Sequence, residues 1–341
     1  MSILLDTDGP ETVRLTAVEA HGLGTDALKR IGFPDDEAKI IMDQLVDNAL
    51  CGYKFAGLPR LLAIAKDKKT TKKREPIRIV KETPLSALID GGNNVGYITA
   101  YRAAEIAIRK AKTTGFASVG VHNSYYSGRN AYYAEMIARE GLVTMHVACG
   151  HLKVLPPGGT KAALGTNPIC FAFPTSKEPF VFDMGTASLM WGEVLLYSHI
   201  GQQLEPGIAF DAEGNATQDA KAVFNGGGVV PFGGHKGFGL SFSVQTLGLL
   251  AGSFLAHGKV QDYGFLFWVL NPEIMLPAGD FQERLDELIE KVKATPRRPG
   301  VDGIRLPSER AFKERARRRE EGILVDKLVV ESIRSIGIRE G

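Results

Sequence analysis

The sequence predicts an α/β protein with a helical N-terminal lobe. Apolar runs of strand length at 86–90, 116–121 and 142–147 alternate with segments in which apolar residues recur at helical spacing. An amphipathic pattern at 35–50 precedes them. The chain has 341 residues, 44% of them hydrophobic, enough for a sizeable core or two domains. Strands that alternate with helices favour a sheet with helices packed on it, in two or three layers.

The segment 35–50 is the most regular predicted helix of the N-terminal lobe. Ala38, Ile41 and Leu45 recur at helical spacing, and acidic residues occupy the first turn, where the helix dipole favours negative charge. Gly52 marks its end, and a loop leads from there into a second, short helix.

A basic run at 66–74 ends this lobe. Such runs are usually solvated loop faces, and this one is interpreted in that way. We therefore place a helical lobe at 1–80, joined by C-terminal helices at 305–341, and an α/β region at 81–304.

The α/β region begins with the strand 86–90, which a glycine-rich turn at 91–96 connects to a helix ended by Gly115. A strand at 116–121 follows at once. Another helix then leads to the strand 142–147.

Two further apolar runs, at 169–173 and 180–182, predict strands that reach the edge of a functional cleft. A glycine-dense stretch at 226–239 leads into the apolar segment 240–255, interpreted as a buried helix because it exceeds strand length. Residues 310–321 mix charges of both signs and predict an exposed helix.

Composition excludes several classes of protein. Lysine and arginine number 41 against 39 acidic residues, so no nucleic-acid partner is expected. The cysteines Cys51, Cys149 and Cys170 form no C-x-x-C pair, which argues against a metal site or a disulfide framework. Residues 1–15 lack the features of a secretory signal, and no apolar stretch reaches membrane-span length. We expect a cytoplasmic protein without membrane contact.

Four glycines between 233 and 239 flank His235 and Lys236 directly before the predicted apolar helix. Glycines allow close approach of a ligand and helix starts attract phosphate, so this segment is a candidate pyrophosphate cradle. It matches neither the P-loop nor G-x-G-x-x-G. A glycine-rich turn that admits tight helix packing is the equally open alternative.

Other polar groups follow predicted strands. Asp183 ends one of them, where it faces a ligand or caps a helix. The segment 122–129 (HNSYYSGR) has the polar density of a catalytic loop or of a polar surface loop. His146, inside a strand, is interpreted as a core histidine, whereas His151 lies near the PPGG turn at 156–159, within reach of a cleft.

Seven short motifs stand out: GGNNVG at 91–96, PPGG at 156–159, LGTNP at 164–168, FDMGTA at 182–187, GIAFDAEGNATQD at 207–219, GGHKGFGL at 233–240 and LPSE at 306–309. Together they resemble the malate/L-lactate dehydrogenase family. These non-Rossmann NAD(P)-dependent oxidoreductases include ureidoglycolate and diketogulonate dehydrogenases and cyclic-imine reductases. LGTNP and GGHKGFGL are highly specific in this order, and LPSE is a weaker echo of the family's L-P-G-E.

The resemblance implies a mixed sheet and hydride transfer between NAD or NADP and a 2-hydroxy acid, its 2-oxo acid or a related imine. It also implies a homodimer with a small-molecule substrate. By the same resemblance, the residues that face the dinucleotide are Phe182, Asp183, Met184, Gly185, Thr186, His235, Lys236, Pro307, Ser308 and Glu309.

The sequence departs from the family where acid/base histidines are usual. Family members show S-H-G-x-x-R in the N-terminal lobe, whereas 55–60 reads FAGLPR, with Ala56 at the histidine position. The family's S-N-H-F-G corresponds to SYYSG at 124–128, so Tyr126 replaces a second histidine. Cys149 stands where an asparagine is usual.

We hypothesise that Tyr126 takes the acid/base role, with Tyr125 as the second candidate and Ser124 beside them in the catalytic segment. Carbonyl reduction needs a proton donor within about 3 Å of the developing alkoxide. A tyrosine pKa, ordinarily about 10, would have to be lowered by a cation such as Lys54 or Arg129, or by the nicotinamide ring.

Arg60 is assigned to the substrate carboxylate, because a guanidinium pairs with it bidentately. Lys54 and Arg129 are further candidate substrate-binding residues. Phe55 and Ala56, in place of Ser-His, predict a pocket more apolar than that of malate or lactate enzymes and a bulkier or less polar substrate.

Two alternatives remain open. An imine reductase would tolerate loss of the histidines more easily, because a protonated imine needs less acid assistance than a ketone. A catalytically silent relative that binds a dinucleotide or metabolite is the other, although Lys236, Asp183 and the segment 122–129 argue against simple decay.

Overall fold

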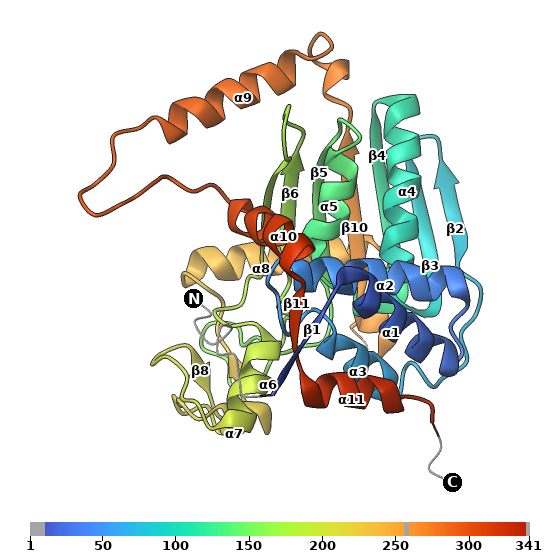
Figure 1. The fold of residues 1–341 in the computed structure, drawn as a ribbon. Helices are drawn as coiled ribbons and strands as arrows, with labels where there is room; N and C mark the ends of the chain where they lie inside the picture. Colours follow the sequence, from blue (N-terminus) through green and yellow to red (C-terminus); the bar gives the residue numbers. More distant parts are fainter. Residues whose placement is uncertain (1–10, 256–258, 339–341) are drawn as a thin grey trace.

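A seven-stranded mixed sheet forms the centre of the molecule (Figure 1). The computed structural model describes residues 11–255 and 259–338; residues 1–10 of the predicted lobe and 339–341 of the C-terminal segment lie outside the described residues. The strand order is β2-β3-β4-β10-β5-β6-β7, with β3 and β4 parallel and the other pairs antiparallel. The strands are β2 (Arg78–Thr83), β3 (Ser86–Val95), β4 (Phe116–Tyr125), β5 (Val143–Cys149), β6 (Ile169–Phe173), β7 (Phe180–Met184) and β10 (Gly264–Leu270).

Helices cover both faces of this sheet. On one face lie α4 (Gly96–Thr114) and α5 (Asn130–Ala138), on the other α8 (His235–Leu250). Successive side chains of β10 point to opposite faces, so Phe267 joins the core beneath α4 and Leu266 the core beneath α8. The predicted mixed α/β sheet is confirmed, with three layers in its central part.

The two ends of the chain meet in a further layer of helices packed on α4 and α5. Its elements are β1 (Thr12–Leu15), α1 (Ala17–Arg30), α2 (Asp35–Leu50), α3 (Pro59–Lys66), α10 (Glu309–Glu321), β11 (Ile323–Asp326) and α11 (Lys327–Ser335). β1 and β11 pair antiparallel, with Thr12 opposite Asp326. The division into two domains stays a prediction, but its boundary at residue 80 falls inside β2, which already belongs to the central sheet.

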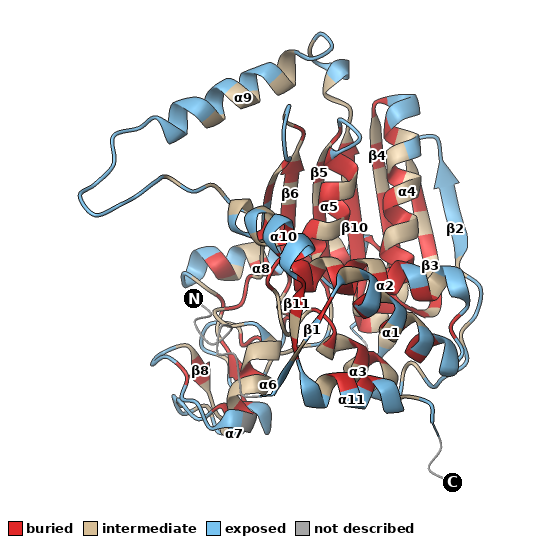
Figure 2. Cartoon of the chain, in the orientation of Figure 1, coloured by how far each residue is buried: buried red, intermediate tan, exposed pale blue. Residues whose placement is uncertain are grey.

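A small lobe with its own core lies beside the sheet and contains α6 (Trp191–Ile200), β8 (Ala209–Phe210), α7 (Ala220–Phe224) and β9 (Gly228–Val229). Two short 3₁₀ helices, η1 (Val260–Asp262) and η2 (Pro272–Ile274), flank β10. The helix α9 (Asp280–Lys293) stands away from the sheet and buries none of its residues (Figures 1 and 2). None of the described helices is long and apolar enough to cross a membrane.

Several predicted elements are confirmed at their residues. The helix predicted at 35–50 is α2, and the strand predicted at 169–173 is β6. Gly115 ends α4 with a φ of 81°, a left-handed conformation that favours glycine. His146 is fully buried, and its ring stacks on Phe267 with 3.8 Å between the centroids, which confirms its interpretation as a core histidine.

The glycine-rich segment 91–96 differs from its prediction as a turn. β3 continues through it to Val95, with an irregularity in the pairing between Asp90 and Asn94. Gly92 and Asn93 take positive φ values there, so they bend the strand and do not end it. β4 extends equally far, and the predicted loop 122–129 is therefore half strand.

Two predicted helices are also placed differently. α8 begins at His235, inside the predicted glycine-dense stretch, and exposes Phe242 and Leu250, so 240–255 is not a buried helix. In α10, predicted as exposed, Arg315 and Arg318 are buried. The sequence pattern predicted the burial of these two helices incorrectly, because burial depends on which other elements cover a helix.

Candidate functional site

Tyr126 directly follows β4 and takes the left-handed conformation, with φ of 53°. Such a backbone is uncommon for a bulky residue and persists where the surroundings enforce it. They do so here: the buried Tyr125 binds the Thr70 hydroxyl at 3.0 Å, and the Tyr133 hydroxyl donates to the Ser127 carbonyl at 2.6 Å. The turn is therefore held on both sides of Tyr126.

Arg60, in the first turn of α3, approaches the same ring. Its guanidinium carbon lies 5.6 Å from the centre of the Tyr126 ring and 4.8 Å from that of Phe55. Phe55 in turn packs against the start of α6, where a Cβ on Gly192 would collide with its ring. Among the described residues, no carboxylate pairs with Arg60, so a partly buried guanidinium keeps its donors for a ligand.

Two residues of the loop after α3 complete the surroundings of Tyr126. The carboxylate of Asp67 acts on the Tyr126 hydroxyl, and Lys69 Nζ lies 5.5 Å from the Tyr126 ring centre and 3.5 Å from Asp67 Oδ2. Burial, with a further contribution from Asp67, raises the pKa of Tyr126 to about 12. The predicted lowering of this pKa is therefore wrong, and the cations beside the ring are Arg60 and Lys69.

A row of contacts leads from this ring toward the small lobe. The Tyr263 ring lies 6.2 Å from that of Tyr126, and Gly150 packs so closely on Tyr263 that a Cβ there would be 2.7 Å from it. His151 follows, its pKa lowered by burial and by the charges of Lys153 and Lys69. The segment from 151 onward thus connects the tyrosine cluster with the cavity described next.

The predicted cofactor segments meet at the end of this row. Ser308 Oγ donates to the Val181 carbonyl at 2.8 Å, which brings the 306–309 turn against β7. The Thr186 carbonyl accepts the Phe232 N–H at 3.0 Å and so connects β7 with the glycines that precede α8. Residues far apart in the sequence are thus brought to one edge of the sheet.

A cavity of about 590 Å³ opens beside these segments. Its lining is apolar and rich in glycine, and includes Leu155, Pro156, Gly159, Ile208, Phe210, Val230, Phe232, Gly233 and Gly234. Gly233 and Gly234 take positive φ, and a Cβ on either would meet open space. Backbone can thus approach a ligand at the N-terminus of α8, where His235 and Lys236 are exposed, so the site fits the size and the phosphates of a dinucleotide.

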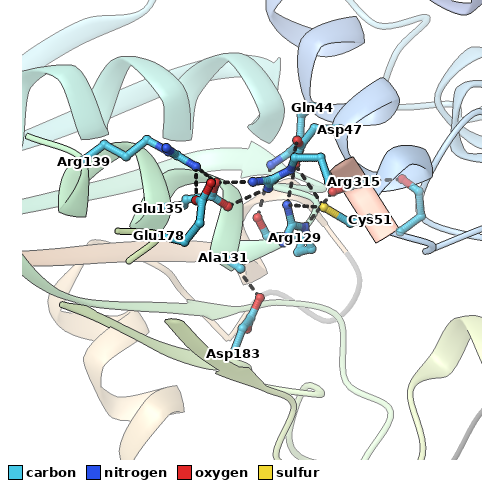
Figure 3. A network of polar contacts seen from close by, with 12 residues as sticks. Gln44, Asp47, Cys51, Arg129, Ala131, Glu135, Arg139, Glu178, Asp183 and Arg315 are labelled. Carbon is cyan, nitrogen blue, oxygen red and sulfur yellow. Dashed lines mark hydrogen bonds and ion pairs between the residues drawn. The ribbon is translucent and has the colours of Figure 1, made fainter. Parts of the chain in front are cut away.

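The side chains of β7 do not all face the cavity. The Asp183 carboxylate accepts the N–H of Ala131 at 2.8 Å in the first turn of α5 (Figure 3), and burial raises its pKa to about 6. Phe182 points to the opposite face because side chains alternate along a strand. Asp183 therefore caps α5, the second of the two roles that the sequence left open. Asp183 and Phe182 point to opposite faces and do not contact the same ligand.

The remaining predicted residues lie away from the Tyr126 ring or have a structural role near it. Arg129 is buried and pairs with Asp47 at 2.5 Å (Figure 3), so it is not available to a substrate carboxylate, contrary to the prediction. Ser124 is buried and bonded to the Thr99 hydroxyl and the Asn94 carbonyl, which leaves it a structural role.

Lys54 precedes Phe55 and is only partly buried, and within the described part of the chain it forms no ion pair. Its assignment to substrate stays a prediction.

Sequence reasoning missed Asp67 and Lys69, which belong to the basic run interpreted as a solvated face. It also missed Tyr263 and Lys153. An acidic residue inside a basic run was the one available signal for Asp67. Nothing local marks Tyr263, because the sheet pairing of β10 with β4 and β5 places it beside residues more than a hundred positions away.

The fold and site define a class: dehydrogenases and reductases that act on CH–OH or C=N groups. A family model described as malate/L-lactate dehydrogenase matches residues 15–334. The chain belongs to this family, which contains NAD(P)-dependent 2-hydroxy-acid dehydrogenases and imine reductases, and the resemblance of the motifs is confirmed.

Similar proteins agree with this assignment. The malate dehydrogenase of Pyrococcus horikoshii is 34% identical over 330 residues, 92% of either chain. The Δ1-pyrroline-2-carboxylate/Δ1-piperideine-2-carboxylate reductase of Pseudomonas putida is 36% identical over 245 residues, 69% of this chain and 70% of that one. The solved structure of the Pyrococcus horikoshii malate dehydrogenase has a TM-score of 0.86 at 31% identity, covering 98% of each chain.

Proposed function

We propose that the protein uses NAD or NADP to interconvert a 2-hydroxy acid and its 2-oxo acid, or a related cyclic imine and amine, with a less polar substrate than malate or lactate. One observation carries this proposal: the guanidinium of Arg60, without a carboxylate partner in the described chain, lies beside the Tyr126 phenol. A substrate carboxylate on Arg60 would hold its neighbouring carbon and oxygen near that hydroxyl.

Binding of the dinucleotide is assigned to the glycines before α8, with Lys236 opposite the phosphates and the Thr186 and Ser308 segments beside them. When bound, the nicotinamide supplies or accepts the hydride. The chain's own contribution is to orient the substrate with Arg60 and to exclude water with Phe55 and Tyr263.

Tyr126 handles the proton. Its raised pKa keeps the phenol protonated at neutral pH, so it is ready to donate to the substrate oxygen in reduction. A phenol with this pKa is a weaker acid than a histidine, which favours a substrate that needs little acid assistance. The reductase of Pseudomonas putida, with its cyclic-imine substrates, therefore supplies the second substrate class to be tested.

We also propose a homodimer. Exposed apolar side chains on α8, among them Phe242 and Leu250, lie on a helix that buries only its other side. α9 exposes Leu288 and buries no residue. A second copy that covers these side chains would remove them from water, which is the main driving force for association.

Fluorescence titrations with NADH and with NADPH, followed by a panel of 2-oxo acids and cyclic imines, test the proposed function. We expect saturable binding of one cofactor and its oxidation by a carboxylate-bearing substrate. Arg60→Met should raise KM at least tenfold while cofactor affinity is kept, whereas Arg109→Met, a control at an exposed position of α4, should leave both unchanged. No binding of either cofactor would overturn the proposal and leave the catalytically silent relative.

A further inference from the structure

We propose that Asp67 and Lys69 form a positioning pair that orients the Tyr126 hydroxyl and exchanges its proton, in place of the histidines usual in the family. This inference rests on the proposed function of Tyr126. It adds two residues, from the loop after α3, to the machinery of proton transfer.

The loop is built to hold this pair in place. Asp67 Oδ1 accepts the Lys69 N–H at 2.7 Å, which closes a tight turn, and Asn93 Nδ2 donates to the Lys69 carbonyl at 3.0 Å. The next residue, Thr70, is bonded to the buried Tyr125. The loop is thus connected to β3 and β4, next to the residue it would position.

The charges around the phenol have a fixed arrangement. Lys69 lies 5.5 Å from the ring centre and 3.5 Å from Asp67 Oδ2, which places the Asp67 carboxylate on the same side of the phenol, and Arg60 approaches from α3. Tyr125 of β4 and Tyr263, the residue before β10, pack edge-on against the ring. Among the described residues, Asp67 is the carboxylate that raises the pKa of Tyr126.

Lys69 connects the pair with solvent. Its side chain is 21% exposed and that of Asp67 13%, so the pair lies between the ring and solvent. The Lys69 ammonium holds the Asp67 carboxylate in place at 3.5 Å, and water can exchange protons with the pair at its exposed side.

Oxidation of a 2-hydroxy acid removes a proton and a hydride from the substrate. The O–H bond of the substrate breaks and its proton goes to the Tyr126 oxygen, while the original phenol proton goes to Asp67. A bound nicotinamide would take the hydride, and with it two electrons, from the substrate carbon. In reduction each step reverses, and the proton consumed comes from protonated Asp67, which exchanges with water.

Labelling with 3-fluorotyrosine gives a readout that does not depend on turnover. The resonance of Tyr126, assigned by its loss in Tyr126→Phe, reports ionisation of the phenol in the full chain. Asp67→Asn removes a negative acceptor and should lower the titration midpoint by about one pH unit, whereas Lys69→Gln should raise it. Lys72→Gln, an exposed neighbour in the same basic run, is the control and should leave it unchanged.

Kinetics then test the role in turnover. In Asp67→Asn, kcat for 2-hydroxy-acid oxidation should fall about 10- to 100-fold with little change in KM, and the acid limb of the pH profile should disappear. Asp67→Glu should recover part of kcat. A merely structural role would move kcat and KM without changing the shape of the profile.

Two results would overturn the inference separately from the proposed function. If the wild type turns over and Asp67→Asn keeps both its titration midpoint and its pH profile, the pair has no role although the function stands. If the wild type binds no cofactor, the function fails and the catalytic role of the pair fails with it. A shifted midpoint together with a lost acid limb supports the inference.

Discussion

Individual side chains decide the chemistry of this site through their neighbours. Tyr126 is surrounded by two cations and one carboxylate, and its pKa is set by burial first and by Asp67 second. A phenol in this setting holds its proton more firmly than a free tyrosine, so acid function is expected at neutral pH and base function only when a neighbour accepts the phenol proton.

Tyr126→Phe should lower kcat about 10²- to 10⁴-fold for 2-oxo acids, because the proton donor is removed while the ring that packs on Tyr263 is kept. Cofactor affinity should stay at the wild-type value. Tyr101→Phe, on α4 and outside the site, is the matched control. Unchanged turnover in Tyr126→Phe, measured by loss of NAD(P)H absorbance, would show that another group protonates the substrate.

His146 makes a prediction about stability. Burial lowers its pKa from 6.5 to about 4, so between these values the unfolded chain binds a proton that the folded chain does not. The free energy of unfolding should therefore fall as pH drops from about 6.5 toward 4, by roughly 3 kcal/mol from this residue. His146→Phe should flatten this part of the pH profile in urea denaturation, and the exposed His235→Gln should not.

Among the elements, three helices are joined by a buried ionic network (Figure 3). Arg315 of α10 contacts Glu135 of α5 at 2.5 Å and Asp47 of α2 at 2.8 Å. Burial acts to raise the pKa of Glu135, but the bonds from Arg315 hold this pKa below the usual glutamate value. The carboxylate therefore stabilises the fold at neutral pH, and this contribution is lost as the pH falls below the pKa of a free glutamate and through the lower pKa of the folded state.

Arg315→Met should destabilise the fold by about 3–5 kcal/mol, because Glu135 and Asp47 stay buried and each loses one of its two arginine partners. Replacing Glu135 as well, in Arg315→Met/Glu135→Met, should recover part of this loss. The exposed pair on the same helix supplies the control, and Arg317→Met should cost less than about 1 kcal/mol in the same urea titrations. Equal losses for the two arginines would contradict the importance of the buried network.

At the scale of the whole molecule, the exposed apolar side chains of α8 and α9 predict association. Light scattering on the purified chain should give twice the monomer mass of 36.9 kDa. The double change Phe242→Glu/Leu250→Glu should yield monomers, because charge would have to be buried in the interface. Val18→Glu, at an even more exposed apolar position on α1, should leave the dimer intact. A monomeric wild type would refute the prediction.

The sequence by itself determined the α/β class, the helix at 35–50 and the family. Local rules suffice there, because apolar periodicity and glycine positions report on the nearest turn, and the motifs are short. It also singled out Arg60 and Tyr126, through their places in recognisable motifs.

Only the tertiary structure decided what those residues meet. In the folded chain Asp67 and Lys69 lie beside Tyr126, and Arg129 forms an ion pair with Asp47. Asp183 caps α5. Such contacts depend on the order of strands in the sheet and on which loops cover its edge. Charge balance and pKa values follow from these long-range contacts and are therefore not readable from local sequence.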